Sequence, residues 1–137
     1  MITLSKEMET GIDKIDEQHR ELIARINAVT AMGTYSVSKE ETQKTIDLLG
    51  EYIVKHFSEE ESLHQQSGYS KLKMHRELHQ TYIKEFQMLK KEFIANGPST
   101  RFTLSLNNSI INWIVRHIKS ADVEFGKYYR GQRAINF

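Results

Sequence analysis

The sequence predicts an all-α protein, a four-helix bundle whose helices run antiparallel in up-down-up-down order. Three observations predict this class. The chain of 137 residues contains only one proline and seven glycines, which are too few for a protein of short strands and turns. Apolar residues recur at steps of three and four positions along four segments. Short connections join these segments, and such connections place consecutive helices side by side in opposite directions.

The first predicted helix covers residues 16–33. Asp16 belongs to the residue types that cap helices, and we expect it to be the N-cap. Inward-facing residues then recur at helical spacing until Gly33, where the helix should end. This inner stripe consists of His19, Leu22, Ile23, Ile26, Val29 and Thr30.

The second predicted helix covers residues 39–66. Ser38 followed three positions later by Glu41 is the pattern of a capping box, which marks a helix start. Gly68 marks the end. The inner stripe of this helix consists of Thr42, Ile46, Leu49, Ile53, His56, Glu60 and Leu63.

The third predicted helix covers residues 71–95. We expect Ser70 to cap it, and the sequence Asn96-Gly97-Pro98 is a strong stop signal. The inner stripe of this helix consists of Leu72, His75, His79, Tyr82, Phe86, Leu89 and Phe93.

The fourth predicted helix covers residues 101–129, and its apolar pattern includes Leu104, Ile111 and Ile114. Residues 130–137 form a tail to which the pattern assigns no structure. A chain of this length forms one domain of ordinary size, so we expect a single domain over residues 1–137.

The composition excludes several kinds of site and partner. Nineteen Lys and Arg against 18 Asp and Glu give a formal charge of +1, which provides no field for nucleic acid or anionic lipid. The absence of cysteine excludes disulfides, thiolate metal sites and iron–sulfur clusters. No apolar run approaches the roughly 18 residues needed to span a bilayer. We therefore expect a cytoplasmic protein without a nucleic-acid or membrane partner.

The unusual feature of this sequence is that polar side chains occupy helix positions that are normally apolar. A buried imidazole or carboxylate without a partner costs several kcal/mol, so these positions need hydrogen bonds, ion pairs or metal. Histidine is the commonest metal ligand in proteins. The residues in question are His19, His56, Glu60, His75, His79 and His117.

Two pairs of these residues stand four positions apart, which stacks their side chains on one helix face. They are His56 with Glu60, and His75 with His79. All four predicted helices contribute a histidine near mid-length, and in an antiparallel bundle these histidines can lie at the same height along the bundle axis. The pattern therefore favours a dinuclear metal site in the core over histidines satisfied by hydrogen bonds alone. Histidines and carboxylates without thiolates suit iron, manganese or zinc.

Asp122 can join this site only under a geometric condition. It follows His117 by five residues, which is about 140° around an ideal helix. Both side chains reach one site only if the helix is locally widened, or if they splay across two metals.

These residues resemble the motifs of the hemerythrins, and especially of the stand-alone bacteriohemerythrins. The resemblance covers nearly the whole chain, which makes the expected single domain over residues 1–137 hemerythrin-like. The matching stretches are GIDKIDEQH at 11–19, HFSEEE at 56–61 with the family motif H-F-x-x-E-E, the residues Tyr69, His75 and His79, and WIVRHIKSAD at 113–122 with the motif W-x-x-x-H-x-x-x-x-D.

In this family such ligands hold two non-haem irons joined by an oxo or hydroxo bridge, and the resemblance implies the same cofactor here. It assigns one iron to three histidines, the other to two histidines, and a bridging role to two carboxylates. One position on the two-histidine iron stays open, and dioxygen binds there in the family. The three histidines of the first iron are His75, His79 and His117, and the two histidines of the second iron are His19 and His56. The two bridging carboxylates are Glu60 and Asp122.

We expect four apolar residues that flank the ligands at helical spacing to line the dioxygen pocket, with an ordinary core position as the alternative for each. They are Ile23, Trp113, Ile114 and Ile118.

His64 is a departure from the family, which commonly has methionine at this position. Three alternatives are open: a partly exposed residue at the helix end, a group that hydrogen-bonds to a metal ligand, or an additional ligand or proton donor. We expect a position just outside the ligands, or at the mouth of the site, rather than coordination.

The resemblance implies reversible dioxygen binding for storage, delivery or buffering, without enzymatic activity. The alternatives are a diiron reductase of peroxide, nitric oxide or dioxygen, an oxygen or iron sensor, and a metal-free interaction module. Besides dioxygen itself, the expected partners are an electron donor or a protein that consumes dioxygen.

Overall fold

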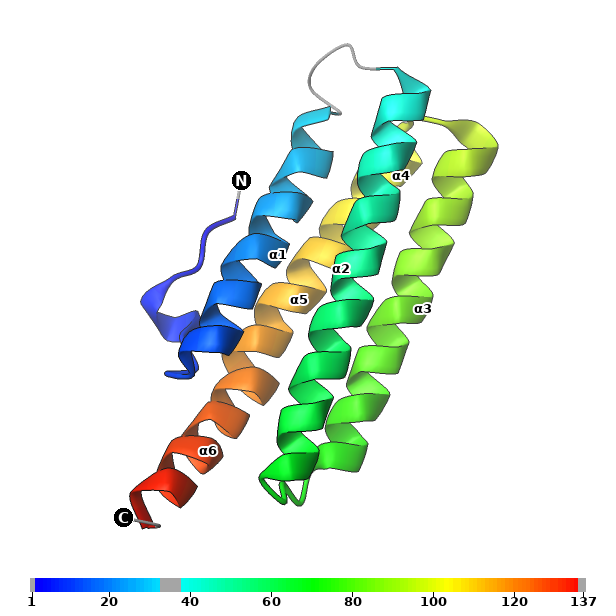
Figure 1. Ribbon diagram of the computed structural model, residues 1–137. Coiled ribbons are helices and arrows are strands. Elements are labelled where there is room, and N and C mark those ends of the chain that lie inside the picture. Colours follow the sequence, from blue (N-terminus) through cyan, green and yellow to red (C-terminus); the bar gives the residue numbers. More distant parts are fainter. Residues whose placement is uncertain (1, 33–37, 136–137) are drawn as a thin grey trace.

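The computed structural model describes residues 2–32 and 38–135, with side chains described as far as residue 132. Four long helical rods lie side by side in this part of the chain (Figure 1), which contains no strand, so the predicted fold class is confirmed. A short 3-10 turn, η1, precedes the rods, and the fourth rod is divided into five segments. The elements are η1 (Lys6–Met8), α1 (Asp13–Met32), α2 (Lys39–Gln66), α3 (Leu72–Asn96), α4 (Thr100–Ser105), η2 (Leu106–Ile111), α5 (Asn112–His117), η3 (Ile118–Asp122) and α6 (Val123–Ile135).

α1 begins at Asp13, three residues earlier than expected, so the prediction of Asp16 as N-cap is wrong. The carboxylate of Asp16 instead accepts hydrogen bonds from the backbone N–H and the hydroxyl of Thr10, both at 2.8 Å, and from the N–H of Gly11 at 3.2 Å. Asp16 therefore fastens the segment before the helix to its first turn. The predicted end at Gly33 lies outside the described residues.

α2 has the bounds that the capping signals predict. The hydroxyl of Ser38 accepts a hydrogen bond from the backbone N–H of Glu41 at 3.1 Å, which satisfies one of the free donors of the first turn.

α3 begins at Leu72, and the prediction of Ser70 as its cap is wrong, because the capping position is Lys71 and no side chain caps this end. The predicted stop is present. Gly97 adopts a φ of +67°, which residues with a Cβ rarely adopt, and it ends the helix after Asn96.

The fourth rod continues through residues 130–135, where the sequence pattern assigned a tail; residues 136–137 lie outside the described part. η2 and η3 are π-helical, so they hold more residues per turn than an α-helix. For this reason the inward face differs from the predicted one, and Leu104 is 55% exposed.

A layer of buried polar side chains separates two apolar clusters in the bundle. The larger cluster has members on all four rods, and the smaller cluster consists of residues at the start of α1, in the turn between α2 and α3, and in α6. On α1, for example, Ile15 belongs to the small cluster, His19 is buried next, and Leu22 belongs to the large cluster. The polar layer therefore lies inside the bundle, with apolar packing above and below it.

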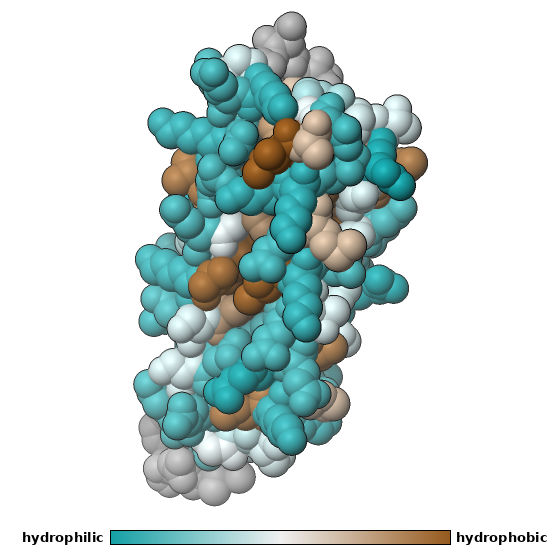
Figure 2. Space-filling view, turned by 90° about the vertical axis from the view of Figure 1, so that its right-hand side faces the viewer, coloured by the Kyte–Doolittle hydropathy of each residue, from teal (hydrophilic) through white to brown (hydrophobic). Residues whose placement is uncertain are grey.

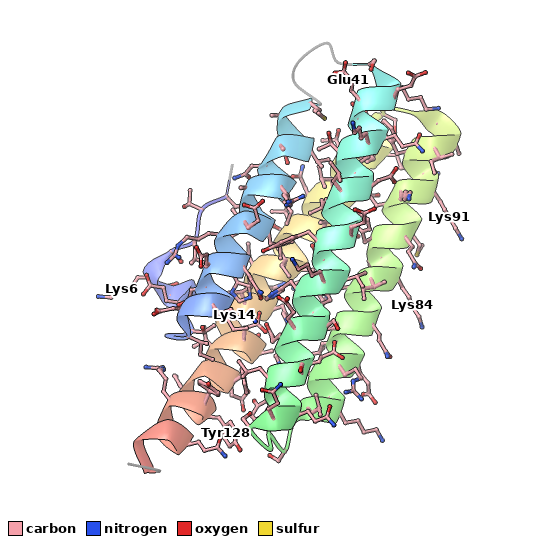
Figure 3. The ribbon with its side chains drawn as sticks, in the orientation of Figure 1. Lys6, Lys14, Glu41, Lys84, Lys91 and Tyr128 are labelled. Carbon is pink, nitrogen blue, oxygen red and sulfur yellow. The ribbon has the colours of Figure 1, made fainter. Side chains whose placement is uncertain are left out.

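The small cluster is closed by contacts between α6 and the turn that joins α2 to α3. The hydroxyl of Tyr128 donates a hydrogen bond to the carbonyl of Ser67 at 2.6 Å, and Figure 3 shows Tyr128 reaching from α6 towards this turn. The amide of Gln132 donates to the same carbonyl at 2.8 Å. These bonds join α6 to the turn between α2 and α3 beside the small cluster.

The segment before α1 packs closely on α6. Gly126 leaves the necessary space, because a Cβ at this position would lie 2.3 Å from the carbonyl oxygen of Thr10. Thr10 itself is fully buried.

The outer surface is mainly hydrophilic. Figure 2 shows the side of the bundle that carries α3, with separate apolar patches on a hydrophilic background, and Figure 3 shows Lys84 and Lys91 projecting from α3 away from the bundle. Among the described residues, no helix has the length and apolar character to cross a membrane.

Candidate metal centre

The polar layer gathers eight buried side chains from all four rods. Each is at most 5% exposed, and together they supply six imidazoles and two carboxylates within the described part of the chain. They are His19, His56, Glu60, His64, His75, His79, His117 and Asp122.

Glu60 turns its two carboxylate oxygens towards two different sets of histidines. Oε1 lies 2.8 Å from Nε2 of His75 and 3.5 Å from Nε2 of His79. Oε2 lies 3.3 Å from Nε2 of His56 and 3.8 Å from Nε2 of His19. Glu60 is thus placed between the two sets.

Asp122 repeats this arrangement from the fourth rod. Its Oδ1 lies 2.8 Å from Nε2 of His75 and 3.1 Å from Nε2 of His117, whereas Oδ2 lies 3.1 Å from Nε2 of His19. Neighbouring ligand atoms of one octahedral metal are about 3 Å apart when each bond is about 2.1 Å. The observed separations are of this size.

The ligand-type atoms consequently form two groups that share both carboxylates. Within each group, the atoms that can bind a cation all lie within 4.8 Å of one another, and every contributing residue is buried. The structure brings together all seven residues that the sequence analysis singled out as ligands. The groups are Glu60, His75, His79, His117 and Asp122, and His19, His56, Glu60 and Asp122.

η3 explains how the helix presents both His117 and Asp122 to one site. This segment is π-helical from Ile118 to Asp122, which is the local widening given as the first of the two alternatives for the five-residue spacing. π-helical turns are frequent at functional sites. The widened backbone of η3 thus allows His117 and Asp122 to reach the same site.

Several buried atoms of the cluster lack a hydrogen-bond partner within the described residues. The ligand-type atoms among them lie 2.8–3.8 Å from other polar atoms of the cluster without forming hydrogen bonds with them, and a buried polar atom left in this way costs about 1–3 kcal/mol. A cation bound at these lone pairs would satisfy them, so the donor set fits a metal. The ligand-type atoms are Nε2 of His19, His56 and His79 and both carboxylate oxygens of Glu60; Nδ1 of His19 and both ring nitrogens of His64 also lack a partner.

The histidines and the carboxylates of the cluster also shift each other's pKa values. Burial by itself lowers the pKa of His19, but contacts with Asp122 and Glu60 outweigh burial and raise this pKa to about 9. The pKa of His75 is also raised to about 9, against the effect of burial, by the same two carboxylates.

The carboxylates shift in the opposite direction. Burial favours the neutral acid, yet contacts with His19 and His56 hold the pKa of Glu60 well below its usual range. The pKa of Asp122 is lowered too, because His117 and His19 outweigh burial and the charge of Glu60. Both carboxylates are therefore ionised, and a bound cation would replace protons on the imidazoles.

Two ligand-type histidines have partners on their outer ring nitrogens. Nδ1 of His56 lies 2.8 Å from Oε1 of Gln18, whose amide nitrogen in turn donates to Glu59. Because the amide oxygen can only accept, the proton of His56 is on Nδ1, which leaves Nε2 free to bind a cation.

On the other side of the site, Nδ1 of His79 lies 2.8 Å from Oε2 of Glu61. Burial tends to raise the pKa of Glu61, but His79 and Arg76 lower it below its usual value. Sequence reasoning missed Gln18 and Glu61. Each adjoins an expected ligand, His19 or Glu60, but each contacts a histidine of another helix, which spacing within one helix does not reveal.

His64 lies fully inside the protein, so a partly exposed position at the helix end or the mouth of the site is wrong. Its Nε2 is 3.6 Å from Oε1 of Glu60, and its ring centre is 4.4 Å from that of His75. Burial, and then the charge of His75, lower the pKa of His64 to about 4.

The expected pocket residues Ile23, Ile114 and Ile118 are buried members of the large apolar cluster. Trp113 is half-buried, and its ring stacks on His117 with centroids 4.7 Å apart. This contact places Trp113 beside the group of three histidines rather than the group of two.

Comparison with known proteins identifies the family. Residues 10–128 match the family model described as the hemerythrin HHE cation binding domain. The chain belongs to the hemerythrin family. The matched residues include both groups of the polar layer, and the resemblance stated from the sequence motifs is confirmed.

Hemerythrin relatives of similar length support this membership. The chain is 30% identical to the bacteriohemerythrin of Clostridium acetobutylicum over 128 residues, which cover 91% of this chain and 98% of the relative. It is 28% identical to the bacteriohemerythrin of Methylococcus capsulatus, with 92% and 94% covered, and 27% identical to that of Stenotrophomonas maltophilia, with 89% and 77% covered.

Proposed function

We propose that this hemerythrin-family chain binds two iron ions in the polar layer and uses them to bind dioxygen reversibly, for storage, delivery or buffering. The observation that carries the proposal is the division of both carboxylates: each turns one oxygen to the group of three histidines and the other oxygen to the group of two. Such carboxylates suit bridges between two metals. A pair of iron(II) ions supplies the two electrons that the reversible reduction of dioxygen requires.

In this proposal the two metal positions have different numbers of histidine ligands. Three imidazoles face one metal position and two face the other, so the second position has fewer protein ligands and keeps room for a small molecule. The residues are His75, His79 and His117 for the first position, His19 and His56 for the second, and Glu60 and Asp122 for both.

The apolar clusters above and below the layer exclude water. Ile23 and Ile118, both nearly inaccessible to solvent, belong to the larger cluster, and we propose that they line the dioxygen pocket together with Ile114, whereas Trp113 lies beside the group of three histidines. A dry site of this kind protects a bound ligand from displacement by water.

The experiment is an anaerobic iron(II) titration followed by exposure to air. Trp113 is the only tryptophan and stacks on His117, so its fluorescence should fall with iron binding and level off at two equivalents. Air should then produce absorption bands in the visible range, and argon should remove them.

An end point at one equivalent contradicts a dinuclear site. If air gives only an oxidised product that argon does not reverse, reversible dioxygen binding is wrong, and a diiron reductase with an electron donor becomes the better hypothesis.

Gln18→Leu is expected to release iron to a chelator about 10–100-fold faster than the unchanged protein, because outer partners of histidine ligands contribute this much to metal affinity. The substitution removes the acceptor that orients His56. Gln80→Leu is the matched control, since Gln80 also adjoins an expected ligand, His79, but is exposed. Equal release rates in the two variants would show that Gln18 does not support the site.

A further inference from the structure

His64 is a buried imidazole that has no role in the metal centre described so far. Neither ring nitrogen has a hydrogen-bond partner within the described residues, and the side chain is inaccessible to solvent. Buried N–H groups are nearly always satisfied in native proteins. An orphaned ring beside a cluster of ligand-type atoms therefore points to a role in that cluster.

The polar group that faces a ring nitrogen of His64 is the carboxylate of Glu60. Aromatic rings enclose His64: the ring centre of Phe125 lies 4.1 Å away in an edge arrangement, and that of Tyr69 lies 5.2 Å away. Nε2 of His64 faces Oε1 of Glu60 at 3.6 Å. This separation exceeds a hydrogen bond by about 0.5 Å, which a small rotation of the ring closes.

Metal binding would remove His75 as a possible donor to this oxygen. Without metal, Nε2 of His75 lies 2.8 Å from Oε1 of Glu60, but its hydrogen bond is with Oδ1 of Asp122, and Oε1 has no hydrogen-bond partner among the described residues. If His75 held a metal through Nε2, this nitrogen would carry no proton to donate. A carboxylate oxygen that binds one metal still has a second lone pair, and His64 is the donor beside it.

We propose that His64 is a positioning residue, whose Nε2–H donates a hydrogen bond to Oε1 of the bridging Glu60 in the metal-loaded protein. The inference rests on the proposed dinuclear centre. His64 is not a ligand: the atoms that can share a metal on this side come from five other residues, and His64 is outside that group. Its hydrogen bond fixes the orientation of Glu60 on the side of the three histidines.

Three substitutions test the hydrogen bond separately from the packing. In His64→Met an apolar, unbranched side chain fills the space of the imidazole but cannot donate a hydrogen bond. In His64→Asn the side chain has an amide, but it is too short to reach Glu60. His64→Gln carries its amide nitrogen at about the distance of Nε2. With iron(II) loaded anaerobically, we expect all three to hold two metal ions, and the Met and Asn variants to lose them to a chelator about 10–100-fold faster. The Gln variant should lose them at nearly the unchanged rate.

A second readout is the infrared carboxylate stretch that appears on metal loading. A lost hydrogen bond to Oε1 should shift this band in the Met and Asn variants and leave it in place in the Gln variant. Circular dichroism of the metal-free proteins controls for folding. Because His64 has no partner there, His64→Met should melt at or above the temperature of the unchanged protein.

Two outcomes overturn the inference. Loss of one metal ion per chain in the Met variant makes His64 a ligand, and unchanged release rates and infrared bands in all three variants leave it no role. Failure of the unchanged protein to hold two metal ions is a different result, because it refutes the proposed centre itself.

Discussion

Glu60→Gln is expected to reduce the iron content from two ions per chain to one or none. The amide is isosteric but neutral, and only its oxygen can bind a metal, so the bridge between the two groups is lost. Five histidines each have Nε2 within 2.8–3.8 Å of one of the two carboxylate oxygens of Glu60. We expect more than about a 100-fold loss of affinity, beyond the loss caused by removing an outer partner.

The measurement is the metal content after dialysis against a chelator. Glu51→Gln is the matched control, because Glu51 lies on the same helix but is exposed. Circular dichroism of both variants separates loss of metal from loss of structure. Two ions per chain in a folded Glu60→Gln variant would remove this residue from the bridge.

Gly126→Ala is expected to destabilise the protein by about 1–3 kcal/mol, although alanine favours helices over glycine by about 1 kcal/mol. The new Cβ would lie 2.3 Å from the carbonyl oxygen and 2.9 Å from the carbonyl carbon of Thr10. Asp16 holds Thr10 through two hydrogen bonds of 2.8 Å, so the segment cannot withdraw without breaking them.

Urea unfolding of the metal-free protein measures this effect. Gly131→Ala on the same helix is the control, because a Cβ at this exposed position would have no described neighbour within 4 Å. This variant should gain up to about 1 kcal/mol. A Gly126→Ala variant as stable as Gly131→Ala would mean that the segment before α1 does not pack on α6.

Local signals in the sequence predict much of this fold. Ser38 and Gly68 give the bounds of α2, because a cap and a stop act within a few residues. The five-residue spacing of His117 and Asp122 predicts either a widened helix or side chains that splay across two metals, because a regular helix turns a known angle per residue, and η3 shows the widened helix. The ligand-type residues are visible because histidines on an inner stripe violate the apolar pattern.

What the sequence could not show depends on contacts between distant segments. Asp16 has the composition of a cap, but its partners are Thr10 and Gly11, which fold back on the helix. The burial of His64 depends on Phe125, which is 61 positions away in the chain. No periodicity within a single helix contains this information.

The two π-helical segments also control the winding of the last rod. A stripe of buried side chains recurs at every fourth position, at Phe102, Leu106, Ile110, Ile114, Ile118 and Asp122, and His117 and Phe125 are buried besides. On a regular α-helix each such step overshoots a full turn by about 40°, so five steps would carry Asp122 about 200° away from the face of Phe102. The wider turns of η2 and η3 absorb this overshoot and keep the stripe straight. Deleting one residue between His117 and Asp122 would leave them four positions apart, a spacing that a regular α-helix keeps on one face, so the last rod would no longer need the wider turn of η3.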